Sequence, residues 1–252
     1  MREAEQRETV RREFAKQASN FEASASLFRH GGILGWIAGH VDVPPEGRIL
    51  DVAGGTGQVG RHLAGDGATA VIVDLTDEML AAGLRSVMDE GRNDVVFVRG
   101  DATVLPFPDD QFDVVVSRFA LHHMDDPAKA IEEMARVSRP EGSVTLIDMV
   151  EGGLRHDELE RLRDPSHTHA LPEDELRAAL SAAGREARRE ADWEQGMPVE
   201  PWLEQAKTPE EARDQIRSAL EEEADGGPPT GLHASRTDDG LTITQRWLLL
   251  GG

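Results

Sequence analysis

The feature that most constrains the fold is a glycine-rich turn placed directly after an apolar stretch. Residues 49–57 read Ile-Leu-Asp-Val-Ala-Gly-Gly-Thr-Gly, and a helix-forming segment follows from Gln58 to Ala64. Small residues let the backbone turn sharply and approach a ligand with its N–H groups pointing toward it. The segment is therefore predicted to be a buried strand that enters a ligand-binding loop, as in proteins that bind nucleotide-type cofactors.

Strand and helix signals alternate along the chain after this turn. Strands are predicted at 48–53, 70–75, 95–99, 112–117 and 143–149, with helices beginning at Thr76 and near Asp126. This alternation is typical of an α/β fold in which helices cover both faces of a parallel sheet. Two further strands, near 186–193 and 241–250, flank a polar segment that is predicted to be helical. These two strands are expected to pair antiparallel.

Composition narrows the classes of partner and the compartment. The chain has 48 Asp and Glu residues against 27 Lys and Arg residues, a net charge of −21, which disfavours nucleic acid as a partner. Cysteine is absent, so disulfides and thiolate ligands are excluded, and no metal site is predicted. No apolar run approaches the ~18–20 residues that span a bilayer, and the N-terminus lacks an apolar signal segment. A cytoplasmic location without a membrane span is expected.

The glycine turn alone does not identify the cofactor. Gly55, Gly57 and Gly60 formally match the dinucleotide fingerprint G-x-G-x-x-G, and Asp74 follows where a ribose-binding acid is expected. However, Asp51 precedes the turn, where a carboxylate disfavours a pyrophosphate and favours an ammonium or sulfonium group. Asp101 follows the third predicted strand, where it can read an adenine amino group. These acids disfavour a nicotinamide cofactor, although an NAD-dependent oxidoreductase remains an alternative.

Seven groups of residues resemble the motifs of class I S-adenosylmethionine-dependent methyltransferases. They are most similar to the ubiquinone/menaquinone-biosynthesis C-methyltransferases and their small-molecule relatives, and they cover about residues 45–150 in order. They read Leu-Asp-Val-Ala-Gly-Gly-Thr-Gly at 50–57, Val-Asp-Leu-Thr-Asp-Glu-Met-Leu at 73–80, Gly-Asp-Ala at 100–102, Leu-Pro-Phe at 105–107, Phe-Asp-Val-Val-Val-Ser-Arg at 112–118, Leu-His-His-Met at 121–124, and Arg-Val-Ser-Arg-Pro-Glu-Gly at 136–142. Ala53 and Gly54 depart from the commoner Gly-Cys, and Glu141 replaces the first Gly of a Pro-Gly-Gly turn.

The resemblance implies a Rossmann-like sheet of seven strands, mostly parallel with an antiparallel last strand, and S-adenosylmethionine as the cofactor. It implies that Asp51 contacts the amino group of the methionine half, Asp74 the ribose hydroxyls and Asp101 the adenine. Asp74 as a helix cap and Asp101 as a turn residue are the alternatives. The full set of expected cofactor-binding residues is Phe21, Asp51, Ala53, Gly54, Gly55, Gly57, Asp74, Leu75, Asp101, Ala102 and Ser117, the last beside the transferring methyl group.

Two histidine-containing segments are candidates for catalysis and acceptor binding. His122 and His123 follow the fourth predicted strand, and imidazole suits a general base when the acceptor must lose a proton. A role in shaping the loop is an equally good interpretation. The segment 164–169, Asp-Pro-Ser-His-Thr-His, is expected near the acceptor pocket or as a polar loop beside it. The expected acceptor-binding residues are Arg118, His167, His169 and Trp202.

Residues 1–252 are expected to form a single domain. The N-terminal element of similar enzymes is matched by Phe14, Lys16, Gln17 and Phe21. The resemblance implies that residues 1–43 form a helical lid over the cofactor, although an amphipathic helix docked on the sheet explains the same spacing. Residues 44–150 are the expected cofactor-binding core. Residues 151–252 are the expected C-terminal part, with a helical cap insert at about 196–235.

The sequence therefore predicts an S-adenosylmethionine-dependent methyltransferase with a small-molecule acceptor. Methylation of carbon in a quinone-like or polyketide-like ring is favoured by the resemblance. Methylation of oxygen or nitrogen in another metabolite is the first alternative, and a domain that binds the cofactor without catalysis is another. The oligomeric state is left open, with a homodimer as one option.

Overall fold

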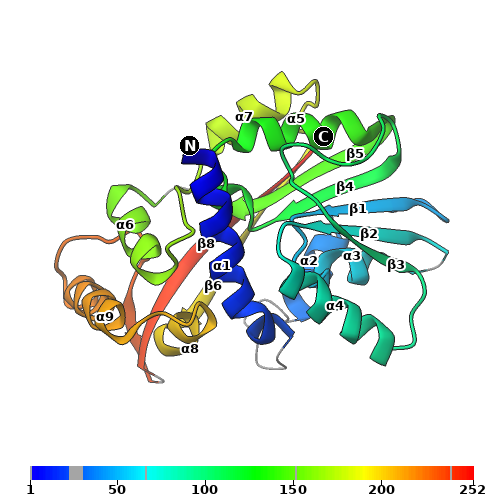
Figure 1. The fold of residues 1–252 in the computed structure, drawn as a ribbon. Coiled ribbons are helices and arrows are strands. Elements are labelled where there is room, and N and C mark those ends of the chain that lie inside the picture. The colour runs from blue at the N-terminus through cyan, green and yellow to red at the C-terminus, as the bar shows by residue number, and fades with distance from the viewer. Residues whose placement is uncertain (1, 23–30, 66, 151, 239) are drawn as a thin grey trace.

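The fold is built on one eight-stranded sheet (Figure 1). The structure is a computed structural model and describes residues 2–22, 31–65, 67–150, 152–238 and 240–252. The strand order is β3-β2-β1-β4-β5-β8-β6, with β7 paired to β8. The strands are β1 (Arg48–Val52), β2 (Thr69–Asp74), β3 (Val95–Arg99), β4 (Phe112–Arg118), β5 (Ser138–Met149), β6 (Arg189–Pro198), β7 (Ser235–Thr237) and β8 (Gly240–Gly251).

Strand direction follows the predicted pattern. The pairs β1–β2, β1–β4, β2–β3 and β4–β5 are parallel, whereas β8 runs antiparallel to both β5 and β6. Trp193 of β6 lies opposite Trp247 of β8, so the two late strands pair as expected. The predicted fold class, a mostly parallel α/β sheet with an antiparallel last strand, is confirmed.

The sheet has one strand more than the seven that were expected. β7 pairs with β8 through Ser235↔Thr242 and Thr237↔Gly240, at the end of the segment expected to be a helical insert. All three residues of β7 are exposed and none is apolar, so the alternation that marks a half-buried strand is missing. Backbone pairing with β8 therefore defines this strand.

Helices cover both faces of the sheet because successive side chains of a strand point to opposite sides. Ile49 of β1 belongs to one apolar core and the next residue, Leu50, belongs to the other. The first core includes residues of α2 (Gly31–Ala38), α3 (Gln58–Leu63), α6 (Leu154–Arg163), α8 (Val199–Gln205) and α9 (Glu210–Ala224). The second includes residues of α5 (Pro127–Val137) and α7 (Glu173–Ala182).

The N-terminal helix α1 (Arg2–Glu22) runs across the front of the molecule in Figure 1. It packs on α4 (Asp77–Asp89), where Ala18 forms a small apolar cluster with Met79 and Ala82. The rest of the expected lid segment includes α2, while residues 1 and 23–30 lie outside the described part of the chain. Among the described helices, none is both long and apolar enough to cross a membrane.

Candidate functional site

A cavity lies where the carboxyl ends of the parallel strands meet, the edge at which open α/β sheets bind ligands. Asp51, Asp74 and Arg118 come from the ends of β1, β2 and β4, and Asp101 follows β3. Residues of α1 line the same cavity, as do Met197 of β6, Trp202 of α8 and Trp247 of β8. The cavity therefore joins the predicted cofactor loop to the C-terminal third of the chain.

The glycine turn brings the backbone close to the first carboxylate. Gly55 and Gly57 adopt left-handed φ angles of 58° and 79°. A Cβ on Gly54 would lie 2.6 Å from Cγ of Asp51, so any side chain there displaces the carboxylate. Ala53, which stands where glycine is commoner in the resembling family, also has a positive φ of 51°. That conformation costs a residue with a side chain roughly 1–2 kcal/mol.

Asp51 is buried at the floor of the turn. Its Oδ2 accepts a hydrogen bond of 2.8 Å from the backbone N–H of Gly60, in α3. Burial raises the pKa of Asp51 to about 6, although the Gly60 N–H and the positive charge of Arg118 oppose the rise. A cationic ligand group would stabilise the ionised form of this carboxylate.

Asp74 is held by two backbone donors, one for each carboxylate oxygen. Its Oδ2 accepts from the N–H of Gly55 at 2.8 Å, and its Oδ1 accepts from the N–H of Thr76 at 2.8 Å. Burial raises the pKa of Asp74 against these hydrogen bonds. The helix-cap interpretation of Asp74 thus applies to Oδ1 alone, which accepts from Thr76 at the start of α4. The side chain of Thr76 itself makes no capping bond. The other oxygen connects the residue to the glycine turn.

Asp101 also has a different partner for each oxygen. Oδ1 accepts from the N–H and the hydroxyl of Thr103, at 2.8 and 2.7 Å, as a turn aspartate does. Oδ2 lies 2.9 Å from Nε of Arg7 in α1. The N-terminal helix is therefore bound directly to the acid that was predicted to read adenine.

Most of the expected cofactor-binding residues line this cavity. They are Phe21, Asp51, Ala53, Gly54, Gly55, Asp74, Leu75, Asp101 and Ala102. Gly57 and Ser117 are not among the lining residues. A Cβ on Gly57 would lie 2.9 Å from Ile72, so close packing on β2 requires glycine there. Ser117 is buried and its Oγ has no hydrogen-bond partner among the described residues.

These residues fit the chemistry of S-adenosylmethionine. Three carboxylates at the ends of three neighbouring strands line one cavity, next to a turn whose glycines leave room for a ligand. The ligand's ammonium and sulfonium groups are cationic and its ribose hydroxyls and adenine amino group are donors, so each matches a carboxylate.

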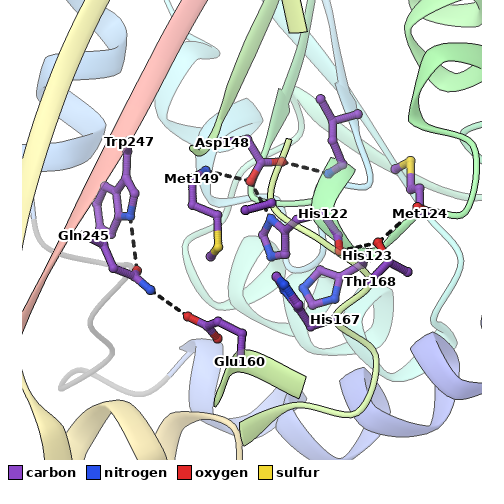
Figure 2. Close-up of polar contacts among 12 residues, drawn as sticks. His122, His123, Met124, Asp148, Met149, Glu160, His167, Thr168, Gln245 and Trp247 are labelled. Atoms are coloured by element: carbon purple, nitrogen blue, oxygen red, sulfur yellow. Dashed lines mark hydrogen bonds and ion pairs between the residues drawn. The ribbon is translucent and has the colours of Figure 1, made fainter. Parts of the chain in front are cut away.

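The two candidate catalytic histidines both line the cavity. Their surroundings differ, because His122 contacts the carboxylate of Asp148 (Figure 2). Nδ1 of His122 hydrogen-bonds to the buried carboxylate of Asp148, at the end of β5. Burial favours neutral His122, but the charge and hydrogen bond of Asp148 outweigh it and raise the pKa of His122. Burial and the nearby His122 lower the pKa of His123 to about 3, so His123 is neutral at physiological pH.

The other two predicted histidines lie elsewhere. His167 is buried, with its ring centroid 5.4 Å from that of His122 and its Nε2 2.7 Å from Oδ1 of Asp157. Neither His167 nor His169 lines the cavity, whereas Arg118 and Trp202 do. No group of described residues has the arrangement of a metal site.

The side of the cavity that the C-terminal third of the chain forms with the ends of β4 and β5 is called the acceptor end below. Six residues that line this end were not predicted to be part of the site. Phe119, Met149, Arg163, Met197, Gln245 and Trp247 line the cavity together with Trp202. Trp247 is only 1% exposed, so it belongs to the core and also borders the cavity. The signal that could have identified Arg163 is its place at the end of α6, just before the 164–169 segment.

A buried polar network supports this end of the cavity (Figure 2). Nε2 of Gln245 donates to Oε1 of Glu160 at 2.7 Å, and Nε1 of Trp247 donates to Oε1 of Gln245 at 3.3 Å. Oε2 of Glu160 accepts from Nη1 of Arg163 at 2.9 Å. Burial opposes ionisation of Glu160, but Arg163 and the neighbouring histidines outweigh it and lower the pKa of Glu160.

Helix α1 is fastened over the cavity by side chains. Nε2 of Gln6 donates to the carbonyl oxygens of His123 and Ser166, at 2.9 and 2.7 Å. Nε2 of Gln17 donates to the buried carboxylate of Asp164 at 2.8 Å. The ring of Phe14 packs edge-on against His123 with centroids 4.9 Å apart. The helix thus contacts both the cofactor end and the acceptor end.

Comparison with known proteins matches this geometry to methyltransferases. Residues 50–146 match a family described as a methyltransferase domain. YcgJ of Bacillus subtilis, an uncharacterized methyltransferase, is 30% identical over 219 residues, which are 84% of this chain and 85% of that protein. The crystal structure of YcgJ superposes with a TM-score of 0.78 at 26% identity, covering 88% of this chain and 98% of that one.

Two further proteins are similar over part of their length or in fold. The ubiquinone/menaquinone biosynthesis C-methyltransferase UbiE of Proteus mirabilis is 36% identical over 129 residues, 50% of this chain and 51% of UbiE. The phosphoethanolamine N-methyltransferase 2 of Haemonchus contortus, solved with S-adenosyl-L-methionine, has a TM-score of 0.60 at 20% identity. That match covers 86% of this chain and 51% of the other.

Proposed function

This chain belongs to the S-adenosylmethionine-dependent methyltransferases, and on that premise we propose that it methylates a carbon atom of a quinone-like or polyketide-like ring in a small molecule. The observation that carries the proposal is the lining of the acceptor end, where Phe119, Trp202 and Trp247 form aromatic walls within a cavity continuous with the cofactor loop. Aromatic side chains favour a flat, apolar ligand. The partial likeness to UbiE supports carbon as the methylated atom.

The residues of the glycine turn and the strand ends hold the cofactor in this proposal. Asp51 binds the amino group, Asp74 the ribose hydroxyls and Asp101 the adenine. When bound, the cofactor supplies a methyl group on a positively charged sulfur, and the bond to sulfur breaks as the bond to the acceptor carbon forms. The chain's contribution is to hold the acceptor in line with that methyl group, because orientation alone removes much of the barrier to such a displacement.

The acceptor carbon must also lose its proton. His122 is the better placed general base, because Asp148 orients its ring and raises its pKa, which strengthens the imidazole as a proton acceptor. His123, whose pKa lies near 3, is a poor base and instead forms a neutral wall. We therefore assign proton transfer to His122, which pairs with Asp148, and the shape of the cavity wall to His123.

We further propose the domain roles that the sequence predicted. Helix α1 acts as a lid, since it borders the cavity through Gln6, Phe14 and Phe21 and excludes water from it. Helices α8 and α9 act as a cap on the acceptor end. The whole chain works as one domain around this cavity.

Product analysis tests the proposal. The protein is incubated with S-adenosylmethionine carrying an isotope-labelled methyl group and with naphthoquinol, catechol or an aliphatic amine. We expect the label on a ring carbon of the quinol, identified by NMR of the product. Label found on oxygen or nitrogen would replace the proposal with the corresponding alternative. Tight binding of S-adenosylhomocysteine without transfer to any acceptor would favour the non-catalytic interpretation.

A further inference from the structure

A buried arginine faces the acceptor end without a full set of partners. Arg163 lines the cavity and is 9% exposed. Its Nε donates to the carbonyl oxygen of Trp202 at 3.2 Å, and its Nη1 donates to Glu160 at 2.9 Å. Its guanidinium carbon lies 4.8 Å from the centroid of the Trp202 ring. Three contacts therefore fix the position of this group.

The second terminal nitrogen of Arg163 is not used by these contacts. Nη2 has no hydrogen-bond partner within the described ranges, and the nearest acid, Glu160, is already bonded through both oxygens, to Gln245 and to Arg163 itself. Nη2 is not one of the fully buried polar atoms that lack a partner, so it is accessible from the cavity that Arg163 lines. A molecule bound in the cavity can therefore accept a hydrogen bond from Nη2.

A second Arg–Glu pair on the same helix shows that the arrangement is not a general feature of α6. Arg155 and Glu158 are also three residues apart and lie 3.0 Å from each other, but their side chains are 54% and 55% exposed. Water satisfies an exposed pair, which contributes little to stability. The buried pair, Glu160 and Arg163, must instead be satisfied by neighbouring groups, because desolvation of both charges is costly.

We infer that Arg163 donates a hydrogen bond to an oxygen on the acceptor's ring, and so selects aromatic acceptors that carry a carbonyl or hydroxyl oxygen. This inference rests on the proposed ring acceptor. A guanidinium only donates, so it binds oxygen and repels an ammonium group. Glu160 balances its charge and Asp164 borders the same cavity, so the site does not require an acceptor with a net negative charge.

Glu160 and Gln245 are positioning residues in this arrangement. They connect α6 to β8, and Glu160 holds the guanidinium of Arg163 against the ring of Trp202. Arg163 determines which ring binds, while Glu160 and Gln245 determine where Arg163 lies. A purely structural role for the network predicts that its loss weakens every acceptor equally.

A pair of ring probes separates the two roles. Alpha-tetralone and tetralin share one bicyclic frame and differ in a carbonyl oxygen. Dissociation constants for both are measured by calorimetry on protein saturated with S-adenosylhomocysteine. The test variant is Glu160→Gln with Arg163→Met, which removes both buried charges together. The matched control is Glu158→Gln with Arg155→Met, which removes the exposed pair from the same helix.

We expect the preference for alpha-tetralone over tetralin to fall about tenfold in the buried-pair variant, equivalent to about 1.4 kcal/mol, and to stay at the wild-type ratio in the control. An unchanged ratio in the buried-pair variant overturns the role of Arg163 and leaves the ring acceptor standing. If the wild type binds neither probe while it binds S-adenosylhomocysteine, the ring acceptor itself is wrong. Should the methionine variant fail to fold, Glu160→Gln with Arg163→Leu gives the same comparison, because leucine also lacks a hydrogen-bond donor.

Discussion

The two ends of the cavity are assembled in different ways. At the cofactor end, Asp51, Asp74 and Asp101 follow three neighbouring parallel strands, and each accepts a hydrogen bond from a backbone N–H. At the acceptor end, the polar groups hold one another through side chains from α6 and β8, as in the link from Gln245 to Glu160. The first end is specified by local chain geometry and the second by tertiary packing.

This difference indicates that acceptor binding can change in such a fold more readily than cofactor binding. A carboxylate held by backbone donors keeps its place as long as the strand and the turn keep their conformation. A side-chain network changes whenever one member changes, so the acceptor end can be altered while the cofactor end is preserved. The predictions below test whether the two ends are separable.

The largest expected effect is at the acceptor end. Trp202 is 1% exposed and packs against Arg163, so Trp202→Ala is expected to lower the free energy of unfolding by about 4 kcal/mol. Urea denaturation measures this loss. Trp193→Ala, at a half-buried position of β6, is expected to cost less. Affinity for S-adenosylhomocysteine in the folded Trp202 variant is expected to stay near wild type, and its collapse would show that the two ends are not separable.

The next effect is at the cofactor end. Asp74→Ala is expected to weaken binding of S-adenosylhomocysteine about 100-fold, because hydrogen bonds to a charged group contribute roughly 1.5–3 kcal/mol each. Calorimetric titration measures it. The control is Asp77→Ala, which removes a nearby exposed carboxylate paired with Arg99. Wild-type affinity in the Asp74 variant would remove this residue from the cofactor site.

A pH effect of intermediate size comes from Asp51. Burial raises the pKa of Asp51 to about 6, so its carboxylate is ionised above that pH and protonated below it. Only the ionised form attracts the ligand's ammonium group, and affinity for S-adenosylhomocysteine is therefore expected to fall as pH drops below about 6, approaching tenfold per unit. Asp51→Asn is expected to bind weakly at every pH. This role would be contradicted by an affinity that does not change with pH between roughly 5 and 8, the range around that pKa.

The smallest effect concerns the contact that joins both ends. Gln6→Leu removes two hydrogen bonds from α1 to the carbonyl oxygens of His123 and Ser166. Each bond contributes about 0.5–1.5 kcal/mol, so the dissociation rate of S-adenosylhomocysteine is expected to rise about fivefold. Stopped-flow measurement detects the change, with Glu5→Gln at an exposed position of α1 as the control. Equal rates in the two variants would remove the lid role of α1.

Much of the fold was predictable because its signals are local. The apolar strand before the glycine turn and the alternation after it predicted β1 to β5, and the family motifs predicted the cofactor. β7 was missed because backbone pairing with β8, and no apolar pattern, defines it. The helix α6 was missed too, since its buried side carries charged residues, among them Asp157, Glu160 and Arg163, in place of an apolar stripe.

The candidate site shows the same division. Arg118 and Trp202 were predicted to bind the acceptor and line the cavity, whereas His167 and His169 do not line it. The resemblance to methyltransferases indicated that the segment 164–169 lies near the pocket. It could not indicate which side chains turn inward, because His167 is directed to Asp157 of α6 by a hydrogen bond that only the folded chain forms.

The sequence was sufficient to predict the cofactor end because a strand, a turn and a carboxylate lie within a few residues of one another. Backbone conformation alone then fixes their relative positions. The partners of Arg163 are Glu160, three residues away, and Trp202, 39 residues away. Glu160 is bonded in turn to Gln245, which is 85 residues from it. Contacts over such separations depend on how helices and strands pack. The tertiary structure therefore decided what surrounds the acceptor, and local chain geometry decided what binds the methyl donor.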